Sequence, residues 1–337
     1  MRDVVFRLTA LWAFSECALG GLMHAFRLPF TGLFVGGFAV LCVGMLAHVS
    51  GRGASVILRA TLLVVLAKAV VSPHSPPQAY LAVGFQGVLG ALLLGYFRPY
   101  TLAALGYGVL AITESALQKL LMLYVFFGKP LFEAVDLFVA DVLRKLGFQS
   151  ELSWAWAIAG AYVGIYALWG AVLGYWIPHL PVLLERRARQ YASLEEVEAP
   201  ELAQSKRPAF YRKMAVLAGM LLFIAGTFLL TSAERGGGVQ KALYAVARTL
   251  AVLALWLFVV RPLLQVFIRR WAKRRAEKES GALQQLLMAL PTWRVRAGQL
   301  FAAVRRRYRG WRLWVEFALA LLAVSLQEQQ PVSVRDR

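Results

Sequence analysis

The chain has 337 residues, of which 59% are hydrophobic, and a mean hydropathy of +0.60. A soluble domain of this size is usually about 45–50% apolar, so the composition excludes an ordinary soluble protein. The formal net charge of +19 would suit a nucleic-acid partner in a soluble chain. In a membrane protein the positive-inside rule and anionic lipids account for it, and we expect no nucleic-acid partner.

Long apolar stretches with few charges recur along the chain and predict transmembrane helices. Residues 130–147 differ, because charged side chains lie opposite apolar ones at helical spacing, which indicates an amphipathic helix at a membrane surface. The sequence predicts eight spans, over 4–25, 29–50, 54–71, 80–97, 101–126, 153–177, 213–231 and 241–261.

The apolar pattern stops at 181–212, where Pro, Glu, Arg, Gln and Ser dominate. We therefore expect an all-α polytopic membrane protein in four parts. They are a six-span helical bundle at 1–180, a cytoplasmic linker at 181–212, a transmembrane hairpin at 213–262 and a basic cytoplasmic helical tail at 263–337.

The charge of the C-terminal part sets the predicted orientation. Residues 261–337 hold sixteen Lys and Arg against five Asp and Glu, a net charge of +11, so this part belongs inside the cell and both termini are cytoplasmic. Pro262 should disturb the helix at the end of the last span. The apolar run 314–326 is short for a span and carries Glu316, so we expect a surface helix or a helix packed on a partner.

Glycines four residues apart predict close contact between helices, because small side chains let two backbones approach in lipid. Such pairs are Gly32 with Gly36, Gly160 with Gly164, and Gly170 with Gly174.

Ionisable and amide side chains inside predicted spans are costly, so each is a candidate for function. In the predicted orientation they gather in the outer half of four spans, next to the proline-rich turn S-P-H-S-P-P-Q-A-Y at 72–80. Prolines lower the entropy that a loop loses when it orders over a ligand. The predicted substrate-binding residues are Glu16, His24, Lys68, His74, Gln78, Gln86, Glu114, Gln118 and Lys119.

The same residues have simpler explanations. Glu16 with Lys68, or Glu114 with Lys119, would serve equally as structural ion pairs. His74 would then be an ordinary loop histidine, and His24 would lie in the headgroup layer.

No phosphate-binding G-x-x-x-x-G-K-[ST] run, no H-E-x-x-H and no G-x-S-x-G occurs in the sequence. We therefore expect no enzyme, no metal and no cofactor. Cys17 and Cys42 lie in apolar spans and are expected to be small packing residues without a disulfide. An intramembrane enzyme using Glu16 and Glu114 as acid and base is a weaker alternative.

The first 180 residues resemble the S component of energy-coupling factor (ECF) vitamin transporters. The stretches that carry the resemblance are A-L-W-A-F-S-E-C-A-L-G-G-L-M-H-A-F in the first span, L-P-F-T-G-L-F-V-G-G-F before the second, and the turn at 72–80. The resemblance implies a small metabolite or vitamin as substrate, a binding pocket in the outer leaflet of the bacterial cytoplasmic membrane, and a first helix whose small residues face a T component.

The C-terminal part is similar to a short T component, whose coupling helices dock on separate ABC-type ATPase subunits. R-V-R-A-G at 294–298 and R-R-Y-R-G at 306–310 approximate the coupling signatures of that family. The resemblance implies partner-binding roles for Arg294, Arg296, Gly298, Arg307, Arg309 and Gly310. The alternative is a membrane scaffold whose basic tail binds anionic lipids or recruits a cytoplasmic partner without transport.

Overall fold

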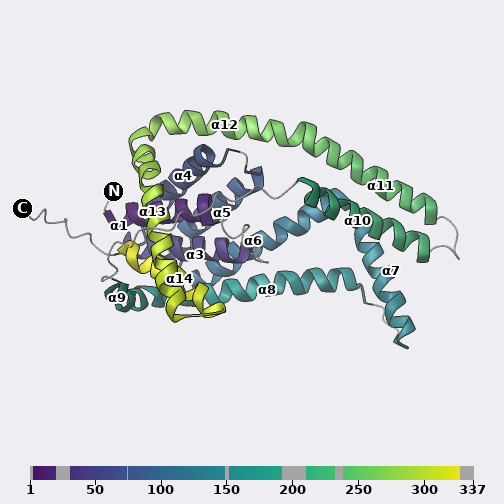
Figure 1. Ribbon diagram of the computed structural model, residues 1–337, viewed down its shortest axis with the longest axis horizontal. Coiled ribbons are helices and arrows are strands. Elements are labelled where there is room, and N and C mark those ends of the chain that lie inside the picture. The colour runs from purple at the N-terminus through teal and green to yellow at the C-terminus, as the bar shows by residue number, and fades with distance from the viewer. Residues whose placement is uncertain are drawn as a thin grey trace, which may run out of the picture. The chain divides into compact units, whose positions relative to one another are not determined.

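The computed structural model describes residues 3–19, 31–73, 75–148, 152–191, 210–231 and 238–326. Every regular element in these ranges is a helix, which confirms the all-α fold (Figure 1). Within the same ranges, five helical stretches are long and apolar enough to cross a membrane, as a multi-pass membrane protein requires. They are α4 (Ala54–Val71), α5 (Pro77–Tyr96), α6 (Tyr100–Phe127), the stretch Trp154–Ala188 and the stretch Gly238–Lys278.

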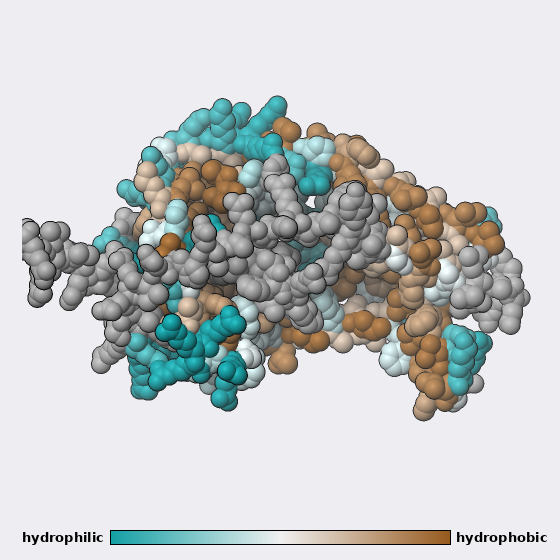
Figure 2. Space-filling model, viewed as in Figure 1, coloured by the Kyte–Doolittle hydropathy of each residue, from teal (hydrophilic) through white to brown (hydrophobic). Residues whose placement is uncertain are grey.

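The other predicted spans also form helices, but with shorter apolar cores. They are α1 (Asp3–Phe14) with the π-helical turn η1 (Ser15–Leu19), α3 (Thr31–Val49) and α10 (Phe210–Thr231). Two predicted spans run on into polar segments. Helix α8 (Trp154–Trp176) passes through a 3₁₀ turn at Ile177–His179 into α9 (Leu180–Tyr191), and α11 (Gly238–Leu255) leads into α12 (Arg261–Lys278). Figure 2 shows hydrophobic surface over α11 and hydrophilic surface over α12.

The chain divides into two compact units. The first is made of residues 1–112, 168–205 and 269–337, and the second of residues 113–167 and 206–268.

In the first unit, α1 lies at the centre of the packing. It contacts α3, α4, α13 (Ser280–Arg307) and α14 (Trp311–Leu326). Leu8, Leu11 and Trp12 of α1 are fully buried. Helix α14 also packs on α9, so the apolar run 314–326 is covered by helices of its own chain.

Glycines bring α6 and α8 together in this unit. A Cβ atom on Gly170 would collide with the backbone of Gly108, and one on Gly174 would lie 2.7 Å from the Cα of Leu105. Gly160, by contrast, has open space where its Cβ would lie. The prediction of close helix contact is therefore confirmed for Gly170 with Gly174, but not for Gly160 with Gly164, which both have open space. Gly108 is the partner that spacing alone did not indicate.

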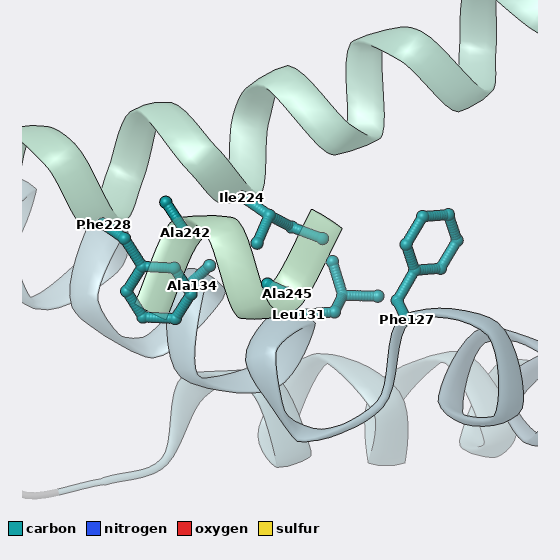
Figure 3. Packing of buried hydrophobic residues seen from close by; sticks show 7 residues of the cluster. All are labelled: Phe127, Leu131, Ala134, Ile224, Phe228, Ala242 and Ala245. Carbon is teal, nitrogen blue, oxygen red and sulfur yellow. The ribbon is translucent and has the colours of Figure 1, made fainter. Parts of the chain in front are cut away.

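The second unit is built around α7 (Lys129–Lys145), the predicted amphipathic helix. Its apolar face packs on α10, and the shared core is shown in Figure 3. This core consists of Phe127, Leu131, Ala134, Ile224, Phe228, Ala242 and Ala245. Leu131 and Ala134 of α7 are thus covered by protein side chains, whereas Phe138 and Val142 further along the helix are exposed. Asp141 forms ion pairs with the exposed side chains of Arg144 and Lys145.

Pro262 does not end the helix that contains it. A π-helical turn, η3 (Trp256–Val260), lies directly before it, and α12 starts at Arg261. Proline lacks an N–H and its ring clashes with the carbonyl four residues earlier, here that of Phe258. A π-turn at this point accommodates the clash, and the helix continues to Lys278.

Candidate functional site

The predicted substrate-binding residues fall into three groups in the structure. Glu16, Lys68, Gln78 and Gln86 belong to the first unit, and Glu114, Gln118 and Lys119 belong to the second. His24 and His74 lie outside the described residues.

Glu16 and Lys68 form an ion pair. The Lys68 Nζ atom donates to the Glu16 Oε2 atom at 2.6 Å, and the side chains of Lys68 and Glu16 are 8% and 7% exposed. Lys68 lies in the last turn of α4, and Glu16 lies in η1 directly after α1. A buried charge is tolerated only when it is paired and hydrogen-bonded, so each of these residues depends on the other.

The π-turn that carries Glu16 is a local departure from α-helical geometry. It begins at Ser15, whose buried hydroxyl donates to the Trp12 carbonyl at 2.8 Å. A π-turn adds one residue to a helical turn and re-aims the side chains after it, and such turns are common at functional sites. This turn places Glu16 beside α4, and η1 contacts α1, α3 and α4.

The proline-rich turn has a clear structural role at the start of α5. Pro76 is the N-cap in an extended conformation and Pro77 is the first helical residue, where the missing N–H costs nothing. Tyr80 closes the turn by donating from its hydroxyl to the Ser72 carbonyl at 3.0 Å. Gln78 is half-buried in the first turn of α5, and Gln86 is 2% exposed two turns further on.

In the second unit, Lys119 binds a tyrosine rather than a carboxylate. Its Nζ atom is 3.0 Å from the Tyr166 hydroxyl, which is also 3.0 Å from the Tyr162 hydroxyl. No ion pair joins Glu114 to Lys119 within the described part of the chain. The structural pairing considered for these two residues is therefore wrong, whereas the one considered for Glu16 and Lys68 is confirmed.

Glu114 keeps one unsatisfied oxygen. Its Oε2 atom is buried and has no hydrogen-bond partner among the described residues, and the same is true of the neighbouring Thr113 Oγ1 atom. A buried carboxylate oxygen without a donor is unfavourable, and each such group in a protein calls for an explanation. Two adjacent orphaned acceptors in the middle of α6 make this stretch the best candidate for ligand contact among the predicted residues.

The predicted partner-binding residues lie along α13 and the turn after it. One face of α13 is buried, at Leu283, Leu286, Trp293, Ala297, Leu300 and Val304. Arg294, Arg307, Arg309 and Gly310 are exposed, while Arg296 and Gly298 are half-buried. Gly310 has a φ of 62° and turns the chain from α13 into α14, a conformation that glycine adopts without strain. Arg294 and Arg307 are thus exposed on α13, and Arg309 is exposed in the turn that follows it.

A groove of about 470 Å³ lies next to α14 in the first unit. Aromatic side chains from α8, α14 and the turn before it line the groove, namely Tyr175, Trp176, Tyr308 and Trp311. At its wall Arg187 makes two hydrogen bonds to Glu316, at 2.7 and 3.0 Å. The sequence predicts a surface helix or a helix packed on a partner around Glu316, and the structure gives this residue a partner in the same chain.

Sequence reasoning missed two cations in the second unit. Lys241 and Arg248 are the only charged residues of α11 (Gly238–Leu255), which overlaps the predicted span 241–261. The signal was present, because charges in an otherwise apolar span mark functional positions.

No group of three His, Cys, Asp or Glu side chains that could hold a metal ion occurs among the described residues. No protein-family model, curated protein or solved structure matches this chain.

Proposed function

We propose that the protein is the substrate-capture subunit of an ECF-type importer, fused to a short coupling module. It would bind a small, partly polar metabolite or vitamin at the outer side of the bacterial cytoplasmic membrane. Separate ATPase subunits would supply the energy, and the chain itself would catalyse no reaction. The six-plus-two span arrangement with cytoplasmic termini is part of this proposal and rests on the charge of +11 in residues 261–337.

The observation that carries the proposal is the packing of α13 and α14 on α1. In the family that the chain resembles, the first helix of the S component faces the T component through small residues. Here Ala10 and Ala13 of α1 are fully buried in the unit that also holds α13 and α14. A contact that joins two subunits in that family would then lie within one chain.

A second link supports the same coupling. The Arg59 guanidinium on α4 donates to the Glu279 carboxylate at 3.0 Å, at the N-cap of α13. Substrate binding in the bundle and ATPase docking on the exposed face of α13 would therefore act on helices in direct contact.

On the ligand side, Glu114 is the residue we expect to matter most. Its unsatisfied oxygen would accept a hydrogen bond from the substrate. The Glu16–Lys68 pair is neutral and already satisfied, so we expect no net charge from it towards a substrate.

A membrane scaffold is the second candidate, and two observations favour it. The Glu16–Lys68 pair needs no ligand to explain it, and the aromatic groove beside α14 offers a surface on which a cytoplasmic protein could dock. An importer requires an ATPase partner, whereas a scaffold does not.

The ligand half of the proposal is tested by Glu114→Ala. We expect the wild-type protein, purified in mild detergent, to carry a small molecule that native mass spectrometry detects, and the variant to lose it. Ser115→Ala, the next residue of the same helix, is the matched control and should retain the molecule. Retention by Glu114→Ala at wild-type occupancy would remove Glu114 from the site.

A further inference from the structure

The second unit contains a cationic cavity that the proposed function does not use. Its volume is about 400 Å³, and it lies between the end of α6, the start of α7, and helices α10 and α11. The lining residues are Tyr124, Lys129, Pro130, Glu133, Phe228, Lys241, Tyr244 and Arg248. Three cations and one carboxylate leave the cavity with an excess of positive charge.

The excess positive charge is not ion-paired among the residues that the structure describes. No ion pair that includes Lys129, Lys241, Arg248 or Glu133 occurs in the part of the chain that the structure describes. Cations in an apolar segment are normally paired or directed to a water-filled site. Two of the three lie on α11, whose remaining side chains are uncharged, so an external anion is the simplest counter-charge.

The fold holds the Arg248 side chain at the cavity. Its Nη1 atom donates to the Phe126 carbonyl at 3.4 Å, where α6 ends. Gly128 adopts a φ of 66°, and a Cβ atom at this position would collide with the Arg248 guanidinium. Glycine suits this position because it adopts the positive φ without strain, and a larger residue would push the Arg248 guanidinium aside.

The remaining groups favour a phosphate. An arginine presents several N–H donors in a plane that matches phosphate oxygens, and two lysines add charge without geometric demand. Tyr124 and Tyr244 bring hydroxyl donors to the same cavity. Helix α7 begins at Lys129, so the positive end of its dipole adds to the field of the side chains.

We propose that this cavity binds a phosphate-bearing anion, with Arg248, Lys241 and Lys129 as its counter-charges. The phosphate could come from a lipid headgroup or from a soluble compound, since both present the same oxygens. Exposed apolar side chains on α10 and α11, among them Leu222 and Leu243, would accommodate acyl chains in the first case.

The test uses the purified full-length chain in a neutral detergent and two probes, short-chain phosphatidylglycerol and inorganic phosphate. Short-chain phosphatidylcholine serves as the zwitterionic comparison. Affinities are measured by isothermal titration calorimetry for the wild-type protein, Arg248→Gln and Lys241→Gln. Lys145→Gln removes one positive charge from α7 away from the cavity and is the matched control.

We expect Arg248→Gln and Lys241→Gln each to weaken the binding of at least one anionic probe by tenfold or more, and Lys145→Gln to leave it unchanged. Binding of phosphatidylglycerol alone assigns the site to a lipid, and binding of inorganic phosphate assigns it to a soluble compound. The proposal is overturned if neither anionic probe binds the wild-type protein. It is also overturned if Arg248→Gln and Lys241→Gln both bind the probes with wild-type affinity. Lys241 is exposed, so its substitution keeps the test valid if Arg248→Gln misfolds.

Discussion

The Lys68 ammonium group and the Glu16 carboxylate lie 2.6 Å apart, buried where α4 meets the π-turn after α1. A buried pair of this kind makes a strong prediction about single and double substitutions, because removing one partner leaves the other charged and buried. We expect Lys68→Met or Glu16→Gln alone to lower the free energy of unfolding by about 3–5 kcal/mol. The double variant should recover most of that loss.

Reversible unfolding of the detergent-solubilised protein gives the required four-member cycle. Single variants that cost no more than a surface ion pair, about 0–1 kcal/mol, would show that the pair is hydrated rather than buried.

The α6–α8 crossing predicts that two glycines of one helix respond differently to the same change. Gly170→Ala should destabilise the protein by about 1–3 kcal/mol, since its methyl group would meet the Gly108 backbone. Gly160→Ala adds the same methyl group where there is open space, and should change stability by less than about 0.5 kcal/mol. Thermal unfolding of both variants checks the prediction, and equal melting temperatures would argue against the crossing.

Two hydrogen bonds from Arg187 of α9 to Glu316 of α14 connect these helices. Arg187→Lys keeps the charge but loses the paired geometry of the guanidinium. Hydrogen bonds to charged groups contribute about 1.5–3 kcal/mol. Losing one weakens the attachment of α14, so we expect faster amide exchange in residues 311–326 of this variant. Exchange in α7 serves as the internal control and should not change.

Asp141 gives a prediction about pH. Its hydrogen bonds with Lys145 and Arg144 hold the pKa of its carboxyl group below that of an ordinary aspartate. A lowered pKa in the folded state means that the interaction stabilises above the unfolded pKa and is lost as the pH falls through the folded one. A carboxyl-carbon NMR titration should show the lowered pKa, and Lys145→Gln should raise it towards the ordinary value. Both cationic partners of Asp141 are exposed, so little change in global stability should accompany this.

The sequence predicted the helices well and their partners poorly. The predicted span 54–71 coincides with α4, and the bounds of the predicted span 153–177 each lie within one residue of those of α8. They could be predicted because an apolar run bounded by polar turns is a local signal. The Arg187–Glu316 pair joins residues 129 positions apart, which no local pattern encodes. The Lys119–Tyr166 contact was missed for the same reason, since a carboxylate is the expected partner of a membrane lysine.

Pro262 disturbs its helix as predicted, but in a form that the sequence did not specify. Proline was expected to disturb the helix, and it does so through a π-turn placed before it rather than through a break. Which of the two outcomes occurs depends on whether the preceding residues can absorb the clash with the Phe258 carbonyl, and that is a property of the folded helix.

The central claim is that the exposed face of α13 docks an ATPase. The most direct measurement is the amount of ATPase that co-purifies with the tagged protein from its native membrane in mild detergent. We expect a stoichiometric ATPase with the wild-type protein and its loss in Arg307→Glu/Arg309→Glu, whose side chains are exposed. Arg144→Glu/Lys145→Glu on α7 reverses the same number of charges and should retain the ATPase. A clean preparation of folded wild-type protein without any ATPase would contradict the importer and leave the scaffold as the better account.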